Sequence, residues 1–411
     1  FNEHIKPSPY QQPFFGSEED DINLFEYLKK KDILLHHPYN SIEPLLHMLE
    51  EAADDPDVLA IKMTIYRLAK NSRVTNALQK AAENGKHVSV LFELKARFDE
   101  ENNIKEAERL EEAGCFVIHG ISRYKTHTKL LLIVRKEENG VVRYVHMSSG
   151  NYNEGTARLY TDVALLTTNE NYAEDVSEFF NVITGHSKPL YYRSLITSPR
   201  DMRNQLIKLI RQEAENAQKG LPSGIVVKIN SLEDRAFIAA LYEASEAGVP
   251  IKLIVRGICC LRPQRLGLSE NIEVRSIVGE FLEHSRIYYF QNEKDPLIYA
   301  GSADVMVRSF DRRIESLFQV SDPILKKLTI NILHYQLMDN INTYLMQEDG
   351  SYRKIEPLED EKHFNIHREF FKFYATREMP RRDDLFSVLV PPPSQNNGQN
   401  LSVAPPVASQ N

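Results

Sequence analysis

The sequence KTHTKLLLIV at residues 125–134 has a counterpart in EHSRIYYF at residues 283–290. Both stretches place a histidine, and then a cation two residues later, directly before an apolar run: His127 with Lys129, and His284 with Arg286. On a β-strand, residues i and i+2 point to the same side, so each imidazole and its cation are predicted to face one phosphate together. A motif that occurs twice, at equivalent places, indicates an internal duplication.

The segments around these two stretches repeat the same order of secondary structure. In each half, apolar runs of strand length alternate with helical stretches, and a β-hairpin, one more strand and a closing helix follow. In the first half, strands are predicted at 58–66, 88–94, 115–120, 129–134, 141–147 and 159–166, with helices at 74–85, 102–113 and 170–183. In the second half, strands are predicted at 224–229, 250–257, 272–278, 286–290, 297–301 and 314–320, with helices at 232–246 and 322–338. This order predicts an α/β fold of two similar domains, with mixed sheets flanked by helices.

The chain divides into four predicted segments. Residues 1–20 form a loose N-terminal segment, and residues 381–411 form a disordered tail rich in Pro, Gln and Asn. Residues 21–190 and 191–380 are the two similar domains. We expect a ligand to bind in the cleft between them.

The composition is that of a globular protein. Hydrophobic residues make up 42% of the 411 residues, charged residues make up 26%, and the net charge is −8. The negative total argues against a nucleic-acid partner, and any anion site must be local. No window approaches the roughly 18 uncharged apolar residues of a membrane-spanning helix, so we expect no membrane span and a cytoplasmic location. Because the first residue is Phe1, we expect the chain to come from a longer gene product.

Further residues in each half complete a site for phosphate chemistry. Each hairpin ends in a small-residue turn, SSGN at 148–151 or AGSAD at 300–304, whose backbone N–H groups are predicted to approach an anion. Each half then offers an acid on the next strand, Asp162 or Glu315, which can bind one ring nitrogen of a histidine and hold the other as a nucleophile. One neutral imidazole can attack phosphorus while the second protonates the leaving oxygen. A single such motif would be interpreted as an ordinary charged strand, but its repetition favours a site.

The remaining histidines, cysteines and cations receive simpler interpretations. His36 and His37 precede a proline and are predicted to lie in a loop, and His146 is predicted to be structural. The three cysteines are predicted to be buried apolar residues. Several further cations are candidates to line a path for a polyanion: Arg123, Lys125, Arg158, Arg308, Arg312 and Arg313.

These motifs resemble a known superfold and, within it, one family. A histidine and cation, a hairpin and a small-residue turn, present twice, are similar to the phospholipase D superfold. The longer strings resemble bacterial polyphosphate kinases of the first type over about residues 14–380: MTIYR at 63–67, ELKARFDE at 93–100, KTHTK at 125–129, SSGNYNEGTARLYTD at 148–162 and SADVMVRSFDRR at 302–313. The phospholipase pattern has an Asp seven residues after its histidine, where this chain has Val134 and Gln291. This departure disfavours a hydrolytic activity.

The resemblance to polyphosphate kinases implies a reaction. It implies reversible transfer of the terminal phosphate of ATP to inorganic polyphosphate through a phosphohistidine, with ATP, ADP and polyphosphate as partners and Mg²⁺ as cofactor. By motif position, His127 is the phosphorylated nucleophile. His284 assists the leaving oxygen and contacts the nucleotide phosphates.

The same resemblance implies roles for other residues. Tyr160 and Arg256 match positions that contact ATP, and Lys129 and Arg286 are predicted to bind phosphate beside them. Two further arginines match positions at the magnesium and phosphate site, Arg67 and Arg97. Because an arginine has only donors, we interpret both as phosphate clamps beside a magnesium ion held by phosphate oxygens and water. The resemblance also implies that the chain represents the two C-terminal catalytic domains of a longer enzyme, which is expected to be a homo-oligomer.

Two alternative functions stay open from the residues. The first is a phospholipase D-like phosphodiesterase that acts through the same histidine. The second is a non-catalytic fragment that binds polyphosphate, which would show tight and salt-sensitive binding without forming ADP.

Overall fold

The computed structural model describes residues 23–69, 72–93, 100–121, 123–185, 191–376 and 385–386. The predicted N-terminal segment 1–20 lies outside the described residues, and so does Arg97. Within the segment predicted as a tail, Leu385 and Phe386 are described, and Leu385 is buried. Among the described helices, none has the length and apolar character needed to cross a membrane.

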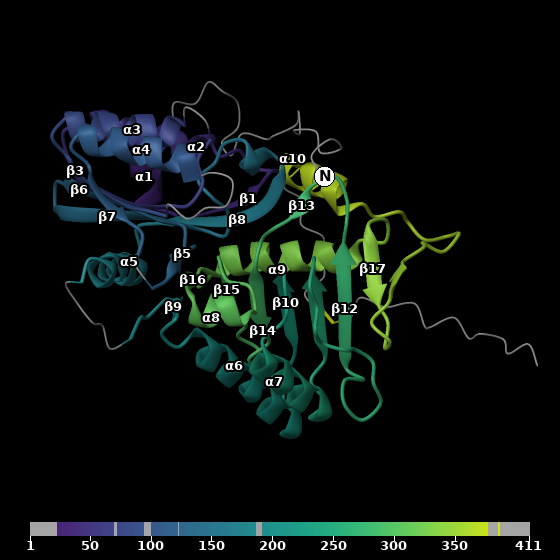
Figure 1. The fold of residues 1–411 in the computed structure, drawn as a ribbon. Helices are drawn as coiled ribbons and strands as arrows, with labels where there is room; N and C mark the ends of the chain where they lie inside the picture. Colours follow the sequence, from purple (N-terminus) through teal and green to yellow (C-terminus); the bar gives the residue numbers. More distant parts are fainter. Residues whose placement is uncertain are drawn as a thin grey trace, which may run out of the picture.

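The first half is built on a mixed sheet. Its strands follow the order β1 (Ile33–His37), β8 (Tyr160–Thr167), β7 (Gly140–Ser148), β6 (Leu130–Glu137), β2 (Val58–Ile65), β3 (His87–Phe92) and β4 (Phe116–His119). Strands β2, β3 and β4 are parallel to one another, and the other pairs are antiparallel. One face carries the helices α1 (Leu24–Leu28), α2 (Glu43–Asp54), α3 (Arg73–Glu83) and α4 (Glu100–Glu112) (Figure 1). Helix α5 (Glu170–Ile183) lies on the opposite face and contacts β6 and β7.

The second half repeats this arrangement. Its strands follow the order β18 (Tyr352–Lys354), β17 (Thr343–Met346), β12 (Ile272–Ile277), β11 (Ile251–Val255), β10 (Ile225–Ile229), β14 (Ile287–Phe290), β15 (Leu297–Gly301) and β16 (Arg313–Gln319), and β9 (Leu195–Ser198) also pairs with β16. Helices α6 (Met202–Gln218) and α7 (Arg235–Glu246) cover one face, and α9 (Pro323–Met338) lies on the other, toward the first half (Figure 1). Two more helices complete this half: α8 (Val307–Asp311), before β16, and α10 (Ile366–Thr376), near β1. The duplication therefore extends from sequence to topology.

Two short strands cross between the halves. Strand β5 (Lys125–Thr126) belongs to the first half in sequence but pairs in parallel with β16 of the second half. Strand β13 (Leu282–Glu283) belongs to the second half but pairs in parallel with β8 of the first. Each crossing strand ends directly before a histidine of the repeated motif. Both histidines therefore lie at the seam between the halves.

A shared hydrophobic core fills this seam. It includes Leu34 and Tyr39 from the first half and Phe281, Ile332 and Phe370 from the second. The Tyr39 ring lies 5.9 Å from the Phe281 ring and 4.9 Å from the Phe370 ring, measured between centroids. Two other apolar clusters fill the two halves separately. Because α5 and α9 lie in the seam and the outer helices cover the opposite faces, strands such as β10, β11 and β14 are buried along their whole length.

The predicted order of elements is confirmed in both halves, although two individual predictions are wrong. His36 and His37 lie on β1 and are buried, and the strand ends at the residue before Pro38. A residue before proline favours extended backbone, so a strand can run up to that point. Of the cysteines, Cys115 is buried as predicted, but Cys260 is exposed.

Candidate active site

His127 is bound to an acid of the other half. It follows β5, and its Nδ1 atom lies 2.8 Å from Oε2 of Glu315 on β16. The backbone N–H groups of His127 and Thr128 donate to the carbonyl oxygen of Ile314, which fixes the start of the ring-bearing segment. Glu315 is fully buried, and His127 is 8% exposed. Glu315 therefore binds Nδ1, and Nε2 is the ring nitrogen that can react with a substrate.

His284 has the mirrored arrangement. Its Nδ1 atom lies 2.8 Å and 3.0 Å from the two carboxylate oxygens of Asp162 on β8. Its backbone N–H donates to the hydroxyl of Thr161, 3.2 Å away. Each acid thus serves the histidine of the opposite half.

Arg286 lies beside the His284 ring, and Asp162 decides its tautomer. The Nη1 atom of Arg286 lies 3.1 Å from Nε2 of His284, and the same guanidinium pairs with Asp304 at 3.2 Å. The same Nη1 atom also lies 3.3 Å from Nδ1 of His284 and donates to the His284 carbonyl oxygen at 2.7 Å, so the guanidinium does not choose between the two ring nitrogens. The carboxylate of Asp162 can only accept, so Nδ1 carries the proton toward Asp162. His284 and the cation two residues later therefore lie in contact.

Lys129 lies differently from Arg286. It is buried, and its ammonium donates to the carbonyl oxygen of His127 itself. That ammonium also lies 5.4 Å from the centre of the Tyr66 ring. Lys129 therefore supports the His127 segment from within the protein.

The ring of Tyr66 organises the surroundings of His127. The imidazole packs against it edge-on at 5.1 Å between centroids. The guanidinium of Arg67 lies 5.6 Å from the ring centre, and the ammonium of Lys125 lies 5.2 Å from it. Positive charge favours an aromatic face, so the ring gathers cations next to the histidine.

The predicted nucleotide-contacting residues gather around His284. The Tyr160 ring lies 5.5 Å from the imidazole, and Arg256 donates to the backbone carbonyl oxygen of Glu283 at 3.1 Å. Together with Arg286, they place a phenol and two guanidinium groups at one imidazole. Arg97 lies outside the described residues.

Burial controls the protonation of both histidines. It lowers the pKa of His284 to about 4 and that of His127 well below its usual value, and nearby cations lower both further. For His127 these cations include Lys129 and Arg286. Both imidazoles are therefore neutral at neutral pH, which is the nucleophilic form.

The pKa values of the two acids are shifted in opposite directions. Burial raises the pKa of Glu315 to about 7, and burial likewise lowers the pKa of Lys129 to about 7. Burial acts on Asp162 too, but its contacts with His284 and Ser149 outweigh it and lower the pKa of that carboxyl group. Asp162 is therefore a fixed anion at neutral pH, whereas Glu315 is close to its titration point.

The small-residue turns hold the acids. A Cβ atom on Gly150 would lie 2.5 Å from a carboxylate oxygen of Asp162, so only glycine fits there, and the Ser149 hydroxyl donates to the same carboxylate. The backbone N–H groups of Ser149, Gly150 and Ser302 donate within the protein. Their acceptors are the carbonyl oxygens of Val163 and Ser316 and the hydroxyl of Ser148, so these three N–H groups are bound to protein oxygens and not to an anion.

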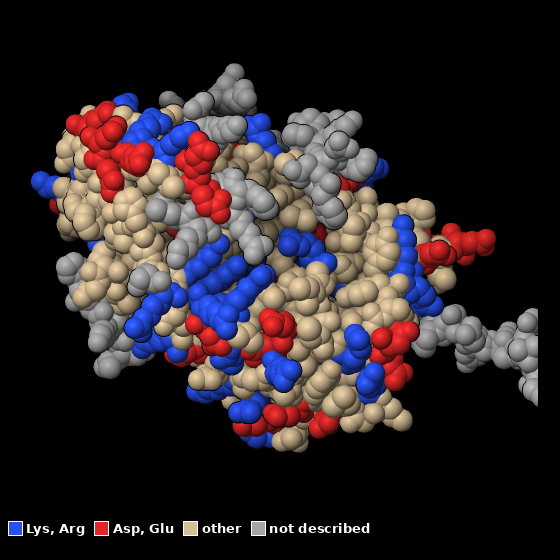
Figure 2. Space-filling view, viewed as in Figure 1, with Lys and Arg blue, Asp and Glu red and all other residues tan. Residues whose placement is uncertain are grey.

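The two histidines lie in a common electrostatic environment. The charges of Arg286 and Arg313 lower the pKa of His127, and a proton on His284 would lower it too. Figure 2 shows Lys and Arg side chains gathered in the middle of the face, over the region where β5 and β16 lie in Figure 1. The chain is negative overall, so this positive charge is local.

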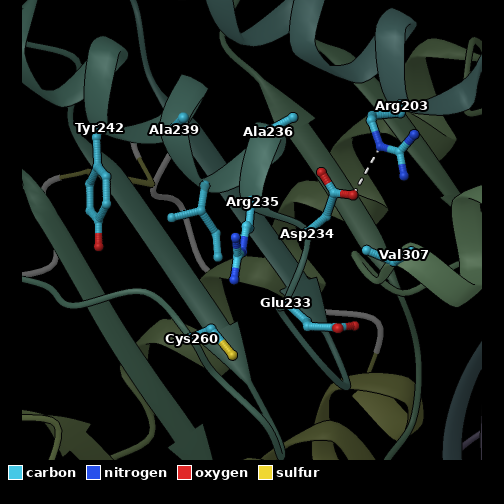
Figure 3. Close-up of a pocket in the computed structure, with 10 residues that line it drawn as sticks. Arg203, Glu233, Asp234, Arg235, Ala236, Ala239, Tyr242, Cys260 and Val307 are labelled. Atoms are coloured by element: carbon cyan, nitrogen blue, oxygen red, sulfur yellow. Dashed lines mark hydrogen bonds and ion pairs between the residues drawn. The ribbon is translucent and has the colours of Figure 1, made fainter.

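A separate hollow of about 800 Å³ lies at the start of α7 (Figure 3). Its lining includes Arg203, which pairs with Asp234 at 2.9 Å, and also Tyr242 and the exposed Cys260. It contains none of the predicted site residues. The candidate site is the seam between the halves, where both histidine–acid pairs lie.

Two protein-family models match the chain. One describes the polyphosphate kinase C-terminal domain 1 and matches residues 23–189, and the other describes the polyphosphate kinase C-terminal domain 2 and matches residues 195–367. The chain belongs to the polyphosphate kinase family. Polyphosphate kinase 1 of Chlorobaculum tepidum is 49% identical over 351 residues, which are 84% of this chain and 50% of that protein. The polyphosphate kinase of Pseudomonas aeruginosa is 48% identical over 335 residues, or 82% of this chain and 49% of that protein. The chain thus spans about half the length of these curated relatives.

Solved structures agree with the family and the fold. The crystal structure of a polyphosphate kinase from Porphyromonas gingivalis has a TM-score of 0.80 at 38% identity, covering 86% of this chain and 54% of that one. A phosphatidylserine synthase from Haemophilus influenzae has a TM-score of 0.53 at 13% identity, covering 85% and 94%, and shares the fold alone. The predicted α/β fold of two similar domains is confirmed.

Three residues in the site were not predicted. Tyr66 lies inside the string MTIYR, yet nothing in its spacing indicates that it packs on His127. Asp304 ends the small-residue turn AGSAD, and its position there could have suggested a partner for Arg286. Glu283, next to His284, is a buried carboxylate that a sequence alone cannot distinguish from a surface charge.

Proposed function

We propose that this chain transfers the terminal phosphate of ATP reversibly to inorganic polyphosphate, with a phosphohistidine on His127 as the intermediate. Membership of the polyphosphate kinase family supports the reaction. The observation that carries the mechanism is the pair of neutral imidazoles in the seam, each held through Nδ1 by an acid of the opposite half. The chain spans about half of its relatives' length, so we propose that this half carries the activity.

The proposed reaction has two steps at one phosphorus atom. In the first, the lone pair on Nε2 of His127 forms a bond to the terminal phosphorus of ATP, the bond from that phosphorus to the bridging oxygen breaks, and ADP leaves with the electron pair. In the second, a terminal oxygen of polyphosphate attacks the same phosphorus, and the N–P bond returns its electrons to His127. The reverse sequence regenerates ATP.

His284 is proposed to assist the leaving oxygen. Its pKa is low without ligand, but the phosphates of ATP bring negative charge beside it, which raises that pKa and favours the imidazolium. Arg256, Arg286 and Tyr160 are proposed to donate to phosphate oxygens near it, because all three lie around His284. Oriented donors of this kind stabilise the charge that spreads over the equatorial oxygens in the transition state.

Magnesium enters the proposal only with the nucleotide. Within the described ranges, no group of three His, Cys, Asp or Glu side chains is arranged to hold a metal ion. Arg67 and Arg97 have only donors and cannot ligate one. Mg²⁺ would therefore be held mainly by the phosphate oxygens of ATP and by water, and it would neutralise phosphate charge there.

The proposal is tested with ATP radiolabelled at its terminal phosphate. We expect the chain to acquire an acid-labile, base-stable label that polyphosphate removes. The label should disappear in His127→Ala and persist in His47→Ala, which changes an exposed histidine of the same half.

Three results would contradict the proposal. A label that persists in His127→Ala excludes His127 as the nucleophile. Salt-sensitive polyphosphate binding with neither label nor ADP would identify a binding module. Release of an alcohol from a diester without any need for nucleotide would identify a phosphodiesterase.

A further inference from the structure

Glu283, the residue before His284, is a buried carboxylate with four side-chain partners. It is 3% exposed. Its oxygens lie within 3.0 Å of groups from four elements of both halves: the Thr161 hydroxyl at 2.9 Å, the Lys228 ammonium at 2.9 Å, the Gln336 amide at 3.0 Å and Nε2 of His367 at 2.8 Å. A buried charge is tolerated only when it is paired and hydrogen-bonded, as this one is.

His367, on the C-terminal helix α10, binds this segment through both ring nitrogens. Its Nδ1 accepts the backbone N–H of Glu280 at 2.9 Å, so the proton is on Nε2, which donates to Glu283. The imidazole is fully buried and packs against the backbone at Gly279, where an added Cβ would lie 2.6 Å from the ring. His367 therefore spans the turn that leads into β13.

The same contacts reach the His284–Asp162 pair. Thr161 donates to Glu283 and accepts the backbone N–H of His284, and the next residue, Asp162, binds the His284 ring. Two adjacent residues of β8 are thus tied to Glu283 and His284. A shift of Glu283 would move the imidazole relative to its acid.

We infer that His367 and Glu283 are positioning residues that fix His284 in the site, so that helix α10 controls the part of the reaction that His284 performs. This inference rests on the proposed function for its kinetic consequence only. Helix α10 is suited to the task because it also packs on the first half. The Phe370 ring lies 4.7 Å from the His36 ring, and the Tyr374 hydroxyl lies 3.2 Å from Nδ1 of His36.

The test combines turnover with a direct measurement of the His284 ring. The chain is labelled with ¹⁵N-histidine, and NMR reports the protonated Nδ1 of His284, assigned by its loss in His284→Gln. We expect His367→Ala to weaken or remove this signal and to lower kcat about 10²-fold with a much smaller change in the KM for ATP, as a displacement of about 1 Å would do. His367→Gln should restore most of both readouts, because its amide can still donate to Glu283.

Two matched variants keep the test decisive. Gly279→Ala keeps the His367 side chain but displaces its ring. We expect a smaller loss of the His284 signal and a kcat about 10-fold lower. His363→Ala changes an exposed histidine four residues away and should alter neither readout. If His367→Ala does not fold, Gly279→Ala decides the question by the same criteria.

The inference is overturned if a folded His367→Ala, or failing that Gly279→Ala, keeps the wild-type His284 signal and kcat. A loss that His367→Gln does not restore would also overturn it, because the proposed bond to Glu283 is then irrelevant. If the wild-type chain shows no turnover, the proposed function fails, and the NMR signal alone still decides whether His367 positions His284.

Discussion

The surroundings of His127 and His284 have the same geometry but different chemistry. Each imidazole follows a crossing strand, and each Nδ1 lies 2.8 Å from an acid of the opposite half. The layer beneath them differs. Under His127, the Thr64 hydroxyl donates to the carbonyl oxygen of Thr128, and the buried ammonium of Lys129 donates to the carbonyl oxygen of His127. Under His284, Lys228 and Glu283 form a buried ion pair.

This difference indicates what the duplication preserved. The direct contact between histidine and acid is the same in both copies, whereas the support behind it and the ionisation of the acid have diverged. Asp162 is an anion beside His284, whereas Glu315 beside His127 is close to its titration point at neutral pH.

The largest effect on stability should come from the ion pair. Lys228 on β10 lies opposite Ile287, three residues after His284, and Thr64 on β2 contacts Leu130, three residues after His127. Lys228→Met leaves the Glu283 carboxylate buried without its counter-charge, and we expect it to lower the free energy of unfolding by about 4 kcal/mol. Thr64→Val removes a neutral hydrogen-bonding group and should cost about 1 kcal/mol.

Denaturant unfolding of the two variants measures this contrast. The double variant Lys228→Met with Glu283→Gln should recover part of the loss, because it removes both charges. Equal costs for Lys228→Met and Thr64→Val would show that the two supports are energetically alike and would remove the contrast.

The exchange of acids predicts which histidine each substitution affects. Asp162→Asn should disturb His284, although Asp162 belongs to the half of His127, and should lower turnover about 10²-fold because the ring loses the acid that fixes its tautomer. Glu315→Gln should disturb His127 instead. The ¹⁵N signals of the two imidazoles distinguish the cases, and a change at His127 in Asp162→Asn would contradict the exchange.

The smallest expected effect is a difference in pH dependence. The pKa of Glu315 is raised to about 7, so between its ordinary value of 4.5 and 7 the folded state holds a proton that the unfolded state has lost, and stability falls as pH rises. Glu315→Gln removes this fall. Between about pH 5 and about pH 8, its free energy of unfolding should rise by about 2 kcal/mol relative to that of the wild type.

Asp162→Asn is the matched comparison for this experiment. The pKa of Asp162 is lowered, so its contribution is present above its ordinary value of 3.8 and is lost only as pH falls further. The difference in the free energy of unfolding between Asp162→Asn and wild type should therefore stay constant over the pH range in which the difference for Glu315→Gln changes. Thermal unfolding across the pH series measures both, and parallel curves for Glu315→Gln and wild type would show that Glu315 titrates normally.

Much of the fold was predictable because the motif and the hydrophobic periodicity are local. The helix predicted at 170–183 coincides with α5, and the hairpin after His127 is found at β6 and β7. Strand β1, helix α10 and the two crossing strands were not predicted. They are short or irregular in pattern, and they are stabilised by packing in the seam between the halves.

The sequence alone determined that the chain is duplicated, and it predicted the residue types of the candidate site: two histidines, two acids and their cations. It did so because strand periodicity fixes which side chains share a side. Only the tertiary structure decided that Asp162 binds His284 and Glu315 binds His127, and that Glu283 joins four elements at one buried point. These pairings depend on strand register and on the packing of segments more than 100 residues apart, and local spacing carries no information about either.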